Sequence, residues 1–148
     1  GLDDELREHL VEVRRAIEPA AAALAARRRT ARDVARLRQL VAAMGRPDHT
    51  RESFAQADLE FHVAIGAVSG NPLMRSFASV VAAALVASFS QSSPLEDERD
   101  HANTVREHAS IVDAIEAQDE RAAAAAMLKV IEIGVQRVAG SRSARKRK

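Results

Sequence analysis

The stretch ADLEFHVAIGAVSGNP, residues 57–72, predicts a helix that ends abruptly. Phe61, Ile65 and Val68 recur at spacings of three and four, which places them on one face of an α-helix. The following SGNP supplies a glycine and an asparagine, which tolerate a left-handed helix end, and a proline that can begin another helix. We therefore predict one helix over residues 51–68 and another from residue 72.

Apolar stripes bounded by caps and turns continue along the whole chain. Hydrophobic residues make up 47% of it, with four Phe and no Trp or Tyr, so Ala, Leu, Val and Ile must build the core. No segment alternates in the manner of a strand. Pro19 is expected to bend or break the first helix near Glu18, and Ser93 and Pro94 to begin the fifth. The remaining helices are predicted over residues 3–28, 31–45, 72–90, 94–117 and 120–138. Short connections then favour an all-α antiparallel bundle of six to seven helices.

The charge of the chain is unevenly distributed. Five of its 22 basic residues lie in the last eight, SRSARKRK, and 17 basic and 21 acidic residues remain in the rest. A mildly acidic body is not typical of a nucleic-acid-binding surface, and we expect residues 141–148 to be a disordered basic tail. The absence of Cys is compatible with the cytoplasm. The uncharged run over residues 76–95 is rich in Ala and Ser, which favours a buried helix over a membrane span.

Asp58 and His62 lie four residues apart, so their side chains share one face of the predicted helix near the edge of its apolar stripe. A carboxylate and an imidazole at this spacing can chelate one metal ion such as Zn, Mn, Fe or Ni. They can equally form a surface ion pair of a few tenths of a kcal/mol. The pair alone does not decide between these interpretations.

Signatures of enzymes are sparse. His108 lies beside the apolar stripe of the fifth helix, where it is either a site residue or a partly buried side chain bonded to a neighbour. Glu98 and His101 form a single E-x-x-H, whereas a di-iron bundle needs two such motifs. There is no H-E-x-x-H, phosphate-binding Gly-rich loop or G-x-S-x-G. We predict that the chain is not an enzyme.

Three segments together form a pattern that occurs in a known protein family: EVRRAIEPAAAALAARRRT, ADLEFHVAIGAVSGNPLM and EHASIVDAIEAQDERAAAAAM. Their order and spacing resemble the FCD domain, the C-terminal effector-binding domain of FadR-subfamily regulators among GntR-type bacterial transcription factors. The resemblance implies a cytoplasmic, homodimeric helical bundle that senses a small carboxylate. It also implies that a winged helix-turn-helix precedes the domain and contacts DNA. We expect residues 1–140 to form the sensing and dimerisation domain, with that DNA-binding part absent from this chain.

The resemblance also implies a divalent metal in the bundle centre, with Zn, Ni and Mn as candidates. Its ligands would be the Asp and His of D-x-x-F-H, here Asp58 and His62, and the His of E-H-x-x-I, here His108. The family's fourth ligand is a His on the last helix, and its position here is Val130. Three ligands can still hold a metal with water or an effector completing the coordination, or the site has become vestigial.

The carboxylate effector implied by the family calls for an arginine, because a guanidinium matches a carboxylate with two parallel hydrogen bonds. Arg14 is the candidate, although it can equally pair with Glu18 one turn later. Asn71 is a second candidate at the pocket mouth, with a role as the C-cap of the preceding helix as the alternative. The leading hypothesis is thus a sensor and dimerisation domain. A purely structural helical domain and a metal-dependent bundle enzyme are the two competing hypotheses.

Overall fold

The chain folds into a bundle of antiparallel helices. The computed structural model describes residues 2–79, 94–95 and 97–148. Its helices are α1 (Leu2–Arg28), α2 (Ala31–Met44), α3 (Arg51–Val68), α5 (Glu98–Glu116) and α6 (Glu120–Lys146), and residues 72–79 are also helical. The described residues contain no strand, which confirms the predicted all-α bundle. The rest of the fourth predicted helix, residues 80–90, lies outside the described residues.

Local sequence explains where several helices begin and end. Thr30 and Thr50 each accept a hydrogen bond from the main-chain N–H three residues later, at 3.1 Å in both cases, which caps α2 and α3. Gly70 has a φ of 69°, and the helical segment after α3 begins at Pro72, as SGNP predicted. The predicted break at Pro19 does not occur, since α1 continues through this residue.

Two predicted helix boundaries were wrong. Helix α5 begins at Glu98 instead of Pro94, because Asp97 accepts the main-chain N–H of Arg99 at 2.8 Å and acts as the cap. Helix α6 continues to Lys146 instead of ending at residue 138. Most of the basic segment predicted to be a disordered tail is therefore helical.

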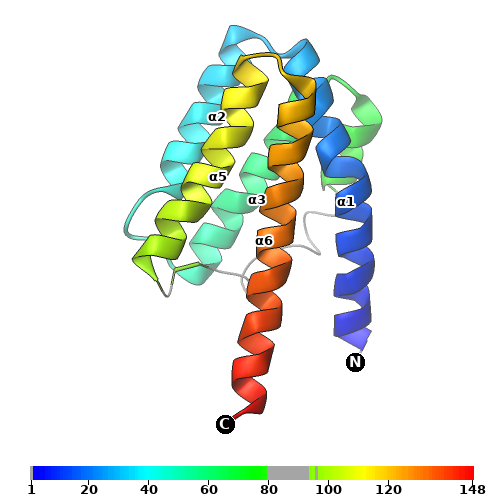
Figure 1. Cartoon of the computed structure of the whole chain (residues 1–148). Helices are drawn as coiled ribbons and strands as arrows, with labels where there is room; N and C mark the ends of the chain where they lie inside the picture. Colours follow the sequence, from blue (N-terminus) through cyan, green and yellow to red (C-terminus); the bar gives the residue numbers. More distant parts are fainter. Residues whose placement is uncertain (1, 80–93, 96) are drawn as a thin grey trace.

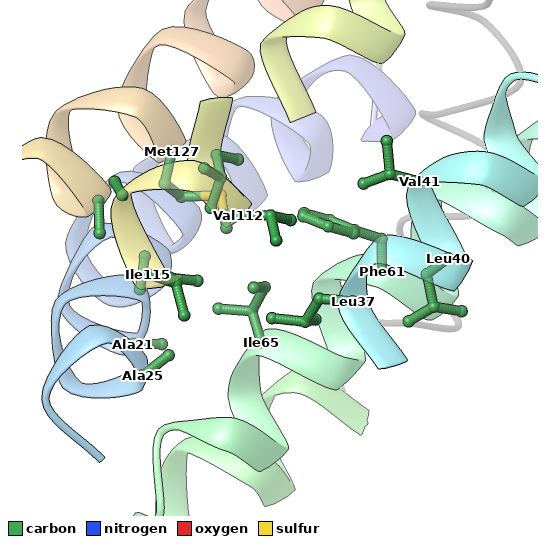
Figure 2. Close-up of a cluster of buried hydrophobic side chains, with 14 of the residues drawn as sticks. Ala21, Ala25, Leu37, Leu40, Val41, Phe61, Ile65, Val112, Ile115 and Met127 are labelled. Carbon is green, nitrogen blue, oxygen red and sulfur yellow. The ribbon is translucent and has the colours of Figure 1, made fainter. Parts of the chain in front are cut away.

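The hydrophobic core lies where α1, α2, α3, α5 and α6 meet. Figure 2 shows Leu37, Phe61, Ile65 and Ile115 converging from three helices, with Met127 of α6 beside them. Helix α1 contributes the small residues Ala21, Ala22, Ala25 and Ala26, all buried. Phe61 is fully buried and is adjacent in sequence to His62, so the core fixes the position of the candidate site.

Helices α1 and α6 lie side by side and run antiparallel, so the two chain termini lie at the same end of the bundle (Figure 1). Arg15 contacts Glu132 at 2.6 Å, and Arg27 contacts Glu120 at 2.8 Å, which sets the register of the two helices. Within the described part of the chain, no helix is long and apolar enough to cross a membrane.

Candidate metal centre

The structure brings the three predicted ligands together. Asp58 and His62 lie one turn apart on α3, and His108 faces them from α5. One carboxylate oxygen of Asp58, Oδ1, is 3.1 Å from Nε2 of His62 and 3.0 Å from Nε2 of His108. A ligand atom from each residue lies within 4.8 Å of the other two. The two imidazoles are 6% and 1% exposed, so a surface ion pair is not what forms here.

The orientation of His108 is set by its other ring nitrogen. Nδ1 lies 2.8 Å from the main-chain carbonyl oxygen of Thr104, which can only accept a hydrogen bond, so Nδ1 carries the proton. In the neutral imidazole, Nε2 then presents a lone pair towards Asp58. Phe61 packs edge-on against this ring with 5.1 Å between ring centroids.

His62 is oriented in the same way by a carboxylate. Its Nδ1 donates to Oε1 of Glu18 on α1, and Oε2 of Glu18 accepts a bond of 2.5 Å from Nε of Arg14. The side chains of Glu18 and Arg14 are 17% and 9% exposed, so this chain of contacts is largely buried. A carboxylate behind a histidine is the usual outer-sphere arrangement of protein metal sites, where it fixes the tautomer and strengthens the ligand.

This donor set fits a divalent metal. When both imidazoles are neutral, each can direct the lone pair of its Nε2 towards Oδ1 of Asp58, and a cation among the three atoms would then be bound by all of them. Two ligand atoms about 2.1 Å from one tetrahedral zinc ion lie about 3.4 Å apart. The separations of 3.1 Å and 3.0 Å in the structure are slightly shorter than this value. Asp58, His62 and His108 could therefore hold a metal as one carboxylate and two imidazoles, a set that suits Zn, Mn, Fe or Ni.

The pKa values of the metal-free site reflect the same contacts. Burial lowers the pKa of His62, but the charge of Glu18 and the hydrogen bond to Asp58 outweigh it and raise the pKa to about 9. Burial raises the pKa of Glu18, yet His62 and Arg14 bring it down to about 2. Burial likewise opposes ionisation of Asp58, and His108 and His62 hold its pKa far below the ordinary range. At neutral pH His62 is therefore protonated, and a metal ion bound at its Nε2 would have to displace that proton.

A cavity of about 730 Å³ opens beside the three ligands and is lined by α1, α3, α5 and α6. Val130 forms part of its wall, so α6 supplies an apolar side chain where the family pattern has a histidine. Arg14 is buried, lines the cavity and also pairs with Glu18, and its role towards an effector stays a prediction. Asn71 does not line the cavity among the described residues. Its Oδ1 accepts the N–H of Leu73 at 3.0 Å and caps the helix that begins at Pro72.

The FCD domain family matches residues 9–132, most of the chain. The chain belongs to this family. This FCD domain is 32% identical over 136 residues to the galactonate operon transcriptional repressor of Escherichia coli, covering 92% of the chain and 59% of the relative. It therefore spans about three fifths of that protein's length.

Two solved structures resemble the FCD domain. Streptococcus agalactiae GntR is 27% identical with a TM-score of 0.73, and the match covers 88% of this chain and 58% of that one. Escherichia coli McbR/YncC is 14% identical with a TM-score of 0.77, and the match covers 91% of this chain and 65% of that one. The second likeness concerns the fold alone.

Sequence reasoning missed one residue of the centre. The sequence predicts Glu18 only as a local partner of Arg14, whereas Glu18 also contacts His62, which is 44 residues away. Its position one turn after Arg14 on a buried helix face was the available signal. The pairing itself depends on how α1 packs against α3, which no local pattern encodes.

Proposed function

We propose that this FCD domain senses a small carboxylate metabolite through a divalent metal held by Asp58, His62 and His108. The observation that carries the proposal is the convergence of two buried imidazoles and one carboxylate from two helices at the wall of a cavity that Arg14 also lines. Three protein ligands leave coordination positions that water or an effector carboxylate can occupy. Arg14 would contact the same carboxylate, because a guanidinium adds directed hydrogen bonds to the charge of the metal.

The domain would act as the regulatory half of a GntR-type transcription regulator in the cytoplasm. Its relatives include a transcriptional repressor, and the chain covers about three fifths of that protein. The remaining part would carry the DNA-binding domain, and homodimerisation would set the spacing of two such domains on an operator. Effector binding would favour one arrangement of the dimer through its differential affinity for the two states. No catalytic step is proposed.

The name of the Escherichia coli relative points to galactonate as the first effector to test. Purified chain should be analysed for bound metal, stripped with a chelator, and titrated with Zn, Ni and Mn. Melting temperatures should then be recorded with and without galactonate. We expect metal to raise the melting temperature and galactonate to raise it further only when metal is present, because binding to the folded state stabilises it.

The matched variants are Asp58→Asn, which keeps the shape of the ligand, and Asp48→Asn, which makes the same change on an exposed turn. The first should abolish metal uptake and the second should leave it unchanged. Equal metal content in Asp58→Asn and the wild type would refute the assignment of Asp58 as a metal ligand.

The second candidate function is a structural dimerisation domain whose metal site is vestigial, and Val130 is the observation that favours it. In that case neither metal nor carboxylates would change the melting temperature, while the chain would still sediment as a dimer. The two candidates therefore predict opposite results in the same titration.

A further inference from the structure

The C-terminal end of α6 carries a run of basic side chains that the metal centre and the cavity do not explain. Helix α6 continues to Lys146, so most of this run is helical. No acidic residue follows Glu132 in the sequence. We call residues 142–148 the basic end of α6. Its five basic residues are Arg142, Arg145, Lys146, Arg147 and Lys148.

The register of α1 and α6 places most of the basic end beyond the bundle. Asp4 of α1 contacts Arg142, so the first residue of α1, Leu2, lies about level with residue 144 of the antiparallel α6. Residues 145–148 therefore lie beyond the described part of α1. In Figure 1 the red end of α6 projects past the other helices, at the end of the bundle where the N-terminus also lies.

Helix α5 separates from α6 even earlier. Asp100, in the first turn of α5, lies 4.0 Å from Arg137, so the basic end extends past the start of α5 as well. The side chains of residues 145–148 are all exposed. Arg142 pairs with Asp4, whereas residues 145–148 form no ion pair with the described part of the chain. Their positive charge is thus available to a partner.

The basic end also holds like charges close together on one face. Arg142, Arg145 and Lys146 follow at spacings of three and four, which places them within an arc of about 100° around the helix. Like charges at these spacings repel and destabilise a helix, and the helix dipole offsets part of this effect in the last turn. A polyanion bound to this face would relieve the repulsion, because each cation would then have an anionic neighbour.

The composition of the basic end favours a nucleic acid over a membrane as that polyanion. A helix that lies on a membrane buries large apolar side chains opposite its basic face, and here the intervening residues are Ser143 and Ala144. Three of the five cations are arginines, whose guanidinium matches a phosphate with two parallel hydrogen bonds. No aromatic side chain is present to stack on unpaired bases, so the contact is with the phosphate backbone.

We propose that the basic end of α6 binds the phosphate backbone of duplex DNA. The choice of duplex DNA rests on the proposed function, in which a DNA-binding domain precedes Leu2, because residues 145–148 lie next to that point. The basic end is about 9 Å long, which corresponds to about three phosphates of one strand. It would add affinity for DNA flanking an operator without reading its sequence.

Fluorescence anisotropy of this chain with a labelled duplex of arbitrary sequence tests the contact. Neutralisation of three phosphates predicts a slope of about −2.7 for the logarithm of affinity against the logarithm of salt concentration. The affinity should then fall about 40-fold between about 50 and 200 mM salt. Changing the sequence of the duplex at constant length should leave the affinity unchanged.

Two charge-matched variants separate the basic end from net charge. Glutamine preserves helix propensity in both, and their melting temperatures show that they fold. The test variant combines Arg145→Gln, Lys146→Gln, Arg147→Gln and Lys148→Gln. The control variant removes four exposed basic residues elsewhere by combining Arg32→Gln, Arg36→Gln, Arg99→Gln and Arg121→Gln. We expect the test variant to bind the duplex at least tenfold more weakly than the control variant at low salt, because it loses the phosphate contacts.

Equal affinities of the two variants would overturn the proposal, since net charge alone would then account for binding. Binding of the wild type to phosphatidylserine vesicles, with no binding to the duplex at equal phosphate concentration, would overturn it in favour of a membrane surface. Binding to neither would also overturn it.

The same variants distinguish this contact from the proposed sensor. Residues 145–148 are not among those that line the cavity, so the test variant should retain the wild-type response to metal and galactonate. A wild-type chain that binds no DNA but responds to metal and galactonate would refute the contact and leave the sensor. A chain that binds DNA through the basic end but responds to neither would refute the sensor and leave the contact.

Discussion

Replacing Glu18 with Gln should weaken metal binding without touching a ligand. Glu18 uses its two oxygens for two donors, Nδ1 of His62 and Nε of Arg14. A glutamine amide has one oxygen and one NH₂ group, so it can satisfy one of these donors while its own hydrogens face the other. His62 thus loses either its hydrogen-bond partner or the negative charge that makes Nε2 a stronger ligand.

The magnitude follows from the outer-sphere role of Glu18. Loss of such a partner lowers metal affinity about 10- to 100-fold, which is about 1.4–2.7 kcal/mol. The upper part of this range is expected, because the Glu18 and His62 side chains are only 17% and 5% exposed and water cannot easily replace the bond. The metal-free chain should also lose about 1.5–3 kcal/mol of unfolding free energy, the contribution of one hydrogen bond to a charged group.

Metal affinity can be measured by competition with a chromophoric chelator, and stability by urea denaturation of chelator-treated protein. Glu60→Gln is the matched control, because it makes the same substitution at an exposed position between Asp58 and His62 in the sequence. It should change neither quantity by more than a few tenths of a kcal/mol. If Glu18→Gln binds metal as tightly as Glu60→Gln does, the outer-sphere role assigned to Glu18 is wrong.

Three further predictions concern the metal, the protons and the packing of the same region. Val130→His should restore a fourth ligand and raise metal affinity at least tenfold in the same competition assay, and an unchanged affinity would show that α6 does not face the ion. In metal-free protein, His62 has a pKa raised from 6.5 to about 9, so its contribution to stability is complete below pH 6.5 and is lost as the pH rises towards 9. Urea midpoints that stay constant over this interval would contradict the assigned contacts. Gly66→Ala should lower the melting temperature, because its new Cβ would lie 2.9 Å from a neighbouring side chain, whereas Gly134→Ala meets nothing within 4 Å and should stabilise α6 by about 0.5–1 kcal/mol. The opposite order of these two melting temperatures would refute the packing argument.

The three ligands could be anticipated because their spacing and family pattern are local. Asp58 and His62 share a helix face at four residues, and His108 lies beside the apolar stripe of another helix. The contacts that orient them could not be anticipated in the same way. Glu18 reaches His62 across 44 residues, and Thr104 orients His108 with a main-chain oxygen, a contact that the identity of its side chain does not reveal.

Some helix boundaries could likewise be predicted from local sequence, and others could not. Thr30 caps α2 through contacts made within three residues, which the local sequence alone can encode. At the start of α5 several capping residues compete, and Asp97 rather than Ser93 begins the helix. The sequence predicts that the last helix ends at residue 138, yet α6 continues past Gly140 and Asp4 of α1 contacts Arg142. A contact between helices thus accompanies a stretch that intrinsic propensity alone would end.

Because α6 carries Val130 where the family pattern has a histidine, the proposed effector would have to connect α6 to the metal centre. A histidine at this position would let the metal itself connect α6 to α3 and α5, whether or not an effector were present. With valine there, the metal would connect only α3 and α5, and an acid bound in the cavity, whose wall includes Val130 of α6, would supply the connection to α6. Effector binding would then change how firmly α6 is held against the centre, which is the differential contact that a sensor requires. On this reasoning Val130→His should increase the stabilisation by metal and decrease the additional stabilisation by galactonate, and a variant in which both increase would refute it.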